Sequence, residues 1–189
     1  TVEALRQGKL DLMAVAVAED PALAGLPVTR PYASFPMVIV GRQLDVAVEG
    51  LNDLTGKRVV VCEASGVEGL LRAAVPHLQL SVVSSVHAGM EAVANGKADA
   101  YVDDLATVDV ELQRYFAGTL RIIGSGRQTL DMGFGLSPEL GARLLPLIDR
   151  AMEYMPQVER LAIQSRYIAA SYALEPSWQQ VLRRIAPYL

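Results

Sequence analysis

The sequence predicts an α/β fold, and three observations support this class. Apolar runs of strand length recur along the chain, at residues 10–17, 35–41, 59–62, 80–83 and 99–102. Segments with apolar residues at helical spacing lie between most of these runs, and glycine or proline marks their ends. This alternation is typical of βαβ units, so we expect a largely parallel sheet.

Composition restricts the classes of function. Of the 189 residues, 51% are hydrophobic and 20% are charged, which is enough apolar material for a packed core. The 17 basic and 21 acidic residues give a formal net charge of −4, and no Lys/Arg-rich run occurs. Nucleic acid is therefore not an expected partner. No apolar stretch approaches the roughly 18 residues that cross a bilayer, so we expect membrane contact only through a parent chain.

The first strand is expected at residues 10–17, which are nearly all apolar and suit a strand covered on both faces. Residues 1–10 resemble the end of a helix closed by Gly8, with neither an N-cap nor a signal peptide ahead of it. We therefore expect the chain to be an excised piece or a mature fragment. The second strand is expected at 35–41, where Pro36 places its start at a sheet edge or at its first residue.

The middle of the chain is predicted to be a self-contained α/β unit, from residue 56 to 123. After the strand at 59–62, residues 64–66 (Ala-Ser-Gly) open a helix, and further helices are expected at 88–95 and 107–115. A fifth strand closes the unit at 120–123.

The remainder has a different character. Gly124-Ser125-Gly126 is expected to separate the fifth strand from another at 132–136, after which Ser137 caps a helix. The rest is predicted to be helical, with breaks at Pro156 and Pro176.

These segments fit most simply into two lobes. Residues 1–43 and 128–189 would form lobe I, and residues 44–127 would be inserted as lobe II. The chain would then cross between the lobes near 42–43 and near 125–127.

Cysteine and histidine give no sign of a catalytic or metal site. Cys62 is the only cysteine, so an internal disulfide is excluded, and its apolar strand predicts a small buried side chain. His77 and His87 have polar surroundings in the sequence and are expected on the surface. We therefore expect no catalytic residue, no metal and no cofactor.

Five segments carry a resemblance to a known family. They are 5–11 (LRQGKLD), 31–32 (PY), 54–59 (LTGKRV), 96–100 (GKADA) and 99–108 (DAYVDDLATV). The first four, in this order and spacing, resemble the bacterial extracellular solute-binding proteins of the amino-acid-binding type, family 3. The last resembles the periplasmic Venus flytrap domains of BvgS-like sensor histidine kinases.

The resemblance implies a two-lobed, periplasmic-binding-protein-like (type II) fold located in the periplasm. In such a fold a small ligand lies between the lobes, and lobe closure buries it. The resemblance extends to about residue 167 but does not include the family's first βαβ portion. Lobe I is therefore expected to be incomplete, or to be completed by another segment.

The residues and the resemblance together indicate a ligand site. Ser65 and Gly66 start a helix at a strand end, where backbone N–H groups and a hydroxyl suit an anion; Ser65 as a plain N-cap is the alternative. Asp104 matches an aspartate that, in the family, binds a ligand's α-amino group. Alternatively, Asp103 caps the next helix while Asp104 is solvated. Tyr32 is expected at the rim of lobe I, either stacking on the ligand or packed in the protein.

One position departs from the family. Amino-acid binders carry an arginine that clamps the ligand carboxylate, and this sequence has Ala22 there. The hydroxyl-bearing residues usual just before it are replaced by 14–17 (AVAV), and Glu19 adds a carboxylate to the same loop. The departure is common in the sensor-kinase branch.

We therefore expect the input domain of a two-component sensor histidine kinase, binding an organic acid, amino acid or amine. The parent receptor could be a homodimer. A free solute-binding protein of an ABC transporter is the first alternative. A cyclohexadienyl-dehydratase-like enzyme would need an arginine clamp beside Glu19, which the sequence does not supply. A LysR-type effector domain is a further alternative, but segments 56–59 and 96–100 fit the solute-binding family better, and this sequence shows no helix-turn-helix.

Overall fold

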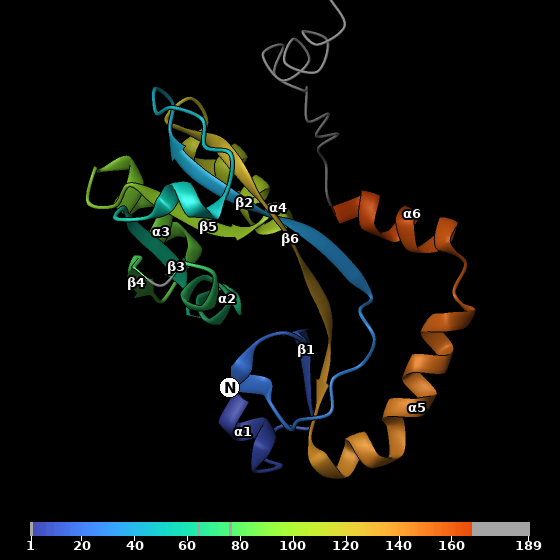
Figure 1. Cartoon of the computed structure of the whole chain (residues 1–189). Helices are drawn as coiled ribbons and strands as arrows, with labels where there is room; N and C mark the ends of the chain where they lie inside the picture. The colour runs from blue at the N-terminus through green and yellow to red at the C-terminus, as the bar shows by residue number, and fades with distance from the viewer. Residues whose placement is uncertain (1, 64, 76, 168–189) are drawn as a thin grey trace, which may run out of the picture.

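The computed structural model describes residues 2–63, 65–75 and 77–167, and one six-stranded sheet runs through them (Figure 1). The strands lie in the order β1-β6-β2-β5-β3-β4. Their bounds are β1 Leu12–Val17, β2 Ala33–Arg42, β3 Arg58–Cys62, β4 Gln79–Val83, β5 Ala100–Asp104 and β6 Leu120–Leu136. The helices are α1 Val2–Arg6, α2 Val67–Ala74, α3 Val86–Ala94, α4 Leu105–Glu111, α5 Pro138–Tyr154 and α6 Gln157–Tyr167.

Figure 1 shows two parts joined by the long strands β2 and β6. One, here called the β3 part, contains β3, β4 and β5 with helices α2, α3 and α4. The other, the β1 part, contains α1, β1 and the first turns of α5. The predicted α/β class is confirmed.

The expectation of a largely parallel sheet is wrong. Only β3 pairs in parallel, with β4 on one side and β5 on the other. The three remaining neighbour pairs, β1 with β6, β6 with β2 and β2 with β5, are antiparallel. The βαβ units are real, but β2 and β6 run in opposite directions through both parts and make the sheet mixed.

The predicted break at Gly124-Ser125-Gly126 is also wrong, because β6 continues through it. A Cβ on Gly124 would lie 2.5 Å from the backbone oxygen of Val48, and one on Gly126 would lie 3.4 Å from Met37. Gly124 therefore allows the loop after β2 to pack closely against β6, instead of forming a turn.

Two apolar layers cover the sheet in the β3 part. On the α2 side, Val59 and Val61 pack with Val67 and Leu71, and on the α3 and α4 side Tyr101 packs with a second buried cluster. Cys62 is buried, as predicted. In contrast, the prediction that strand 10–17 is covered on both faces is wrong, because Leu12 and Val15 of the edge strand β1 are 41% and 50% exposed.

Helix boundaries agree with the predicted caps. The hydroxyl of Ser137 accepts from the backbone N–H of Leu140 and begins α5, and Pro156 separates α5 from α6. The predicted break at Pro176 lies outside the described residues.

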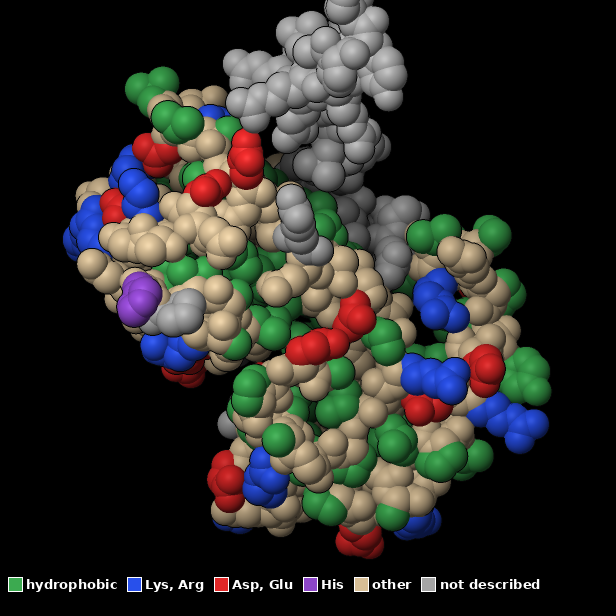
Figure 2. Space-filling model, viewed as in Figure 1, with side chains coloured by type: hydrophobic (Ala, Val, Ile, Leu, Met, Phe, Trp, Pro, Cys, Tyr) green, Lys and Arg blue, Asp and Glu red, His purple; other side chains and the backbone are tan. Residues whose placement is uncertain are grey.

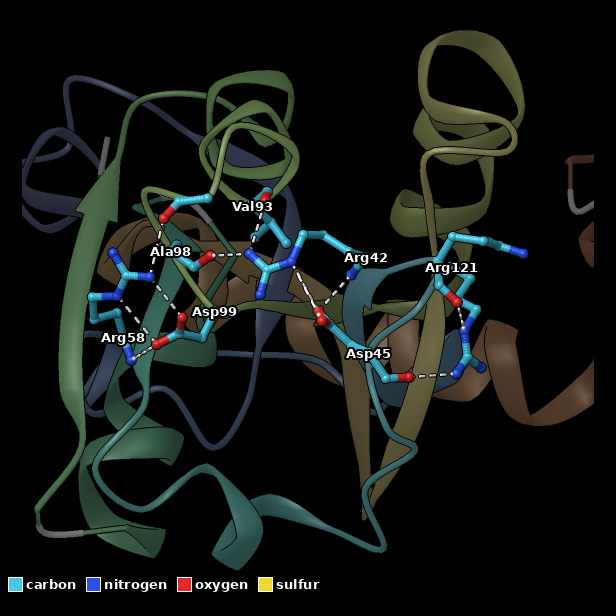
Figure 3. Close-up of polar contacts among 9 residues, drawn as sticks. Arg42, Asp45, Arg58, Val93, Ala98, Asp99 and Arg121 are labelled. Carbon is cyan, nitrogen blue, oxygen red and sulfur yellow. Dashed lines mark hydrogen bonds and ion pairs between the residues drawn. The ribbon is translucent and has the colours of Figure 1, made fainter.

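Three arginines, Arg42, Arg58 and Arg121, bind carboxylates or backbone carbonyls near the amino end of β5 and the start of β6 (Figure 3). Arg58 pairs with Asp99 at 2.6 Å and donates to the carbonyls of Gly96 and Lys97. Arg42 binds Asp45 in the same region (Figure 3). The Arg58 guanidinium lowers the pKa of Asp99 to about 2. Two of the family-like segments, 54–59 and 96–100, are therefore joined by a structural ion pair at the amino ends of β3 and β5.

Candidate ligand site between the two parts

The candidate site lies at the opposite, carboxyl ends of β3 and β5. Because these strands are parallel, their carboxyl ends meet at one edge of the sheet, where open α/β sheets present ligand-binding groups. Helix α2 follows β3 and helix α4 follows β5. Both helices therefore begin near this edge, facing the junction with the β1 part.

Ser65 and Gly66 form the turn into α2. The Ser65 hydroxyl donates to the Cys62 carbonyl at 2.8 Å and accepts from the Val67 N–H at 3.3 Å. Gly66 is the N-cap, with a φ of +69° that favours glycine. Ser65 therefore stabilises the turn locally, and Gly66, which has no side chain, leaves the backbone at the start of α2 accessible to a close neighbour.

The neighbour of this turn is the loop after β1. A Cβ on Gly66 would lie 3.0 Å from Val17, and one on Gly69 would lie 2.7 Å from the Pro21 ring. The two parts are thus in van der Waals contact at Gly66, the N-cap of α2, and at Gly69 within the helix.

A cleft of about 390 Å³ lies beside this contact, lined by Asp20 of the β1 part and Glu63 of the β3 part. Figure 2 shows a notch between the two parts, with acidic side chains close to it. Asp20 is engaged locally, since its carboxylate accepts from the N–H of Ala22. Glu19 is exposed and lines neither this cleft nor the larger cavity described below.

Asp103 and Asp104 are both buried, at 2% and 3% exposure. The carboxylate of Asp104 accepts from the Thr107 N–H at 2.9 Å, so Asp104 caps α4, and the alternative in which Asp103 caps it and Asp104 is solvated is wrong. Asp103 accepts from the Tyr101 hydroxyl at 2.5 Å and from the Asp104 N–H at 2.9 Å. Burial raises the pKa of Asp103 to about 7, against the opposing effect of the Tyr101 hydrogen bond.

Tyr32 faces this acidic pair from the β1 part. Its hydroxyl donates to the Ala14 carbonyl at 3.0 Å, and its ring lies 4.8 Å from that of Phe134. Partial burial raises the pKa of Tyr32, and the negative charge of Asp104 raises it further. Tyr32 is therefore both packed and positioned at the junction.

Tyr32 also lines a cavity with a volume of about 740 Å³. Residues from α4, β2, β6, α5 and α6 surround it, including Thr107, Met132, Phe134 and Arg160. The sequence reasoning missed these residues because they lie on separate elements. One signal was present: apolar side chains alternate with glycine in 132–135 (MGFG), as expected of a strand with one closely packed face.

The arrangement brings the predicted residues together in two groups. Ser65 and Gly66 lie opposite Val17, and Asp104 lies close to Tyr32. Among the described residues, neither Asp103 nor Asp104 forms an ion pair, and no cluster of three metal-binding side chains occurs. The geometry is that of a junction able to bind a small molecule.

No family model matches the sequence. Among curated proteins, virulence sensor protein BvgS of Bordetella pertussis is 29% identical over 164 residues, which cover 86% of this chain and 13% of BvgS. Among solved structures, a double mutant of the B. pertussis BvgS VFT2 domain has a TM-score of 0.76 at 27% identity, covering 88% of this chain and 71% of that one. The B. pertussis BvgS periplasmic domain gives a TM-score of 0.75 at 26% identity, covering 98% of this chain and 36% of that one.

The chain is homologous to the periplasmic Venus flytrap domains of BvgS. The expected family, fold and periplasmic location are thereby confirmed. The chain spans only 13% of the length of BvgS. No helix of the described residues is long and apolar enough to cross a membrane.

More distant structures share the fold alone. A histidine kinase sensor domain with similarity to periplasmic binding proteins has a TM-score of 0.77 at 16% identity and covers 88% of this chain and 73% of that one. An ancestral arginine-binding protein has a TM-score of 0.73 at 20% identity, with 88% and 75% covered.

Proposed function

We propose that this domain binds a small organic solute between its two lobes and is the sensing input of a parent two-component histidine kinase. Homology to the Venus flytrap domains of the sensor protein BvgS supports the sensing role. The ligand-binding role rests mainly on one observation: the starts of α2 and α4 face Tyr32 and the loop after β1. A ligand contacting both sides would favour one lobe arrangement over another.

The lobe division stays a proposal, with one refinement supported by strand pairing. The predicted division has lobe I as 1–43 with 128–189 and lobe II as 44–127. We propose to move 37–43 into lobe II, so that lobe I is 1–36 with 128–189 and lobe II is 37–127. Residues Met37–Val40 pair with β5. The register between β2 and β6 shifts between Pro36 and Val38, opposite Thr129 and Ser125, and again between Ile39 and Val40. Register shifts in the pairing of the two strands that connect the lobes would make this place a suitable hinge.

The absence of an arginine in the loop after β1 bears on the ligand. Ala22 cannot clamp a carboxylate, so an ordinary α-amino acid would lack its usual contact there. Asp103 and Asp104 would favour an amine at their end of the junction. We also propose that the domain is not itself an enzyme, since Glu19 lies exposed in the loop without a guanidinium partner in any described ion pair.

Thermal-shift screening of organic acids, amino acids and amines, followed by calorimetry of each hit, tests the proposal. The variant Asp104→Asn keeps the N-cap but removes the charge, so we expect at least tenfold weaker binding of any amine hit. Glu91→Gln, an exposed change on α3, is the matched control. Tight binding that is unchanged in Asp104→Asn would remove Asp104 from the site, and a broad panel without any hit would contradict solute binding.

A further inference from the structure

The 740 Å³ cavity has walls from both parts of the molecule. Val110 of α4 belongs to the β3 part, whereas Met132 and Phe134 of β6 lie beyond the hinge. Met152 of α5 and Ile163 of α6 form the remaining side. Figure 1 shows α6 beside β2, separated from the β1 end of the sheet by the length of α5. A molecule in this cavity would therefore touch α4, the two crossing strands and α6 at once.

The walls are mainly apolar and adaptable. Three methionines, Met132, Met152 and Met155, line the cavity together with Phe35 and Phe134. Thioether side chains adjust to ligands of irregular shape and contact aromatic rings favourably. The volume lies within the range of about 300–1,000 Å³ usual for small-molecule sites. Walls of this kind favour a ligand with a hydrocarbon or aromatic portion.

Two charged side chains reach the cavity, and they are not equivalent. Glu111 is paired, with its carboxylate 2.6 Å from the Nδ1 atom of His87. Arg160 donates through one nitrogen, Nη2, to the carbonyls of Met152 at 2.9 Å and Met155 at 3.3 Å. It forms no ion pair with a described residue. The cavity therefore presents one cation without an acidic partner in the described chain.

We propose that this cavity binds a hydrophobic carboxylate, with the hydrocarbon body between Phe134 and Val110 and the carboxylate paired with Arg160. The inference rests on the proposed function and names a solute class for this cavity, which Asp103 and Asp104, the side chains that would favour an amine, do not line. Arg160 is held by the carbonyls at the end of α5, which position its guanidinium for a charge-assisted pair. The ligand would join α6 to α4 across the hinge and stabilise one lobe arrangement.

Calorimetric titration of the domain with hexanoate, octanoate and decanoate tests the apolar part of the proposal. Each added methylene should tighten binding about three- to fourfold while the cavity still has room. Octylamine, which has the same body and the opposite charge, should bind at least tenfold more weakly than octanoate. Equal affinity for the two, or no dependence on chain length, would overturn the proposal.

The variant Arg160→Gln tests the charged part and should weaken octanoate binding about tenfold or more. Arg150→Gln removes the same charge from α5 outside the cavity, where Arg150 lies over the ring of Tyr154, and should leave affinity unchanged.

Because Arg160 also contacts the α5 carbonyls, Val110→Glu provides an independent test. Val110 is 54% exposed, so the new carboxylate should repel octanoate without disturbing the fold. Unchanged affinity in both Arg160→Gln and Val110→Glu would place the ligand elsewhere.

Failure of this inference can be distinguished from failure of the proposed function. If a screened solute binds and is lost in Asp104→Asn while octanoate does not bind, the domain is a sensor with a different ligand class. If octanoate binds without changing the separation of the lobes, the cavity is a binding site but the sensing proposal is wrong.

Discussion

Asp103 is the residue whose environment differs most from that of an ordinary surface carboxylate. It is 2% exposed, receives hydrogen bonds from Tyr101 and Asp104, and has no cation beside it among the described ion pairs. Burial and the adjacent charge of Asp104 both disfavour its ionised form. The Asp103 carboxyl of the native protein therefore keeps its proton up to a higher pH than the same group does in the unfolded chain.

The difference between the pKa of Asp103 in the folded and in the unfolded chain predicts that stability depends on pH. The pKa of Asp103 is about 7 in the folded chain and about 3.9 in an unfolded one. Between these values the native state binds more protons, so the free energy of unfolding should fall as pH rises from about 4 to about 7, by about 1.4 kcal/mol per pKa unit of difference. Urea unfolding across this range should show the decline in the wild type.

Asp103→Asn removes the titrating group and keeps a hydrogen-bonding side chain toward Tyr101. The decline between pH 4 and pH 7 should therefore be smaller in the variant than in the wild type. Asp53→Asn, at an exposed carboxylate of the β3 part, controls for the loss of one charge. Parallel stability curves for the wild type and Asp103→Asn would show that Asp103 is already ionised in the native state.

At the scale of elements, the local sequence pattern predicted most strands and helices, but it did not predict how the strands pair. Apolar runs located β3 and β5, and caps such as Ser137 located helix starts, because these signals are contained in a few neighbouring residues. The continuity of β6 could not be predicted, since Gly124 is required by Val48, a neighbour only in the folded chain. The same reason hid Arg160 and Phe134, which meet at one cavity from different elements.

Helix α2 packs against the loop after β1, and this contact can be altered at one position. Gly69→Ala should favour the helix locally by about 1 kcal/mol, but its Cβ would lie 2.7 Å from the Pro21 ring. We expect α2 to stay folded while the two parts separate, which small-angle scattering would detect as a larger radius of gyration.

The double variant Pro21→Ala with Gly69→Ala provides the control, because it removes the ring atoms that the new methyl group would meet. It should return the radius of gyration toward the wild-type value. If Gly69→Ala leaves this radius unchanged, the contact between α2 and the loop after β1 does not set the separation of the two parts.

In the whole molecule, the sheet is continuous but its pairing is irregular where it passes from one part to the other. Strands β2 and β6 connect the two parts, and their register shifts at Pro36–Val38. Residues that line the 740 Å³ cavity lie on both sides of this shift: Tyr32 on the side of the β1 part, and Thr107 and Val110 of α4 on the side of the β3 part. A ligand at the junction would therefore change the relative position of the two parts, which is the motion expected of a Venus flytrap domain.

The most direct test of this claim is the distance between spin labels on the two parts, measured by pulsed electron paramagnetic resonance with and without ligand. Ala73→Cys on α2 and Ala142→Cys on α5 are exposed labelling positions, in a Cys62→Ala background that removes the only native thiol. We predict that a solute that raises the melting temperature will shift and narrow the distance distribution. An identical distribution with and without every such solute would contradict a ligand-driven change in lobe arrangement.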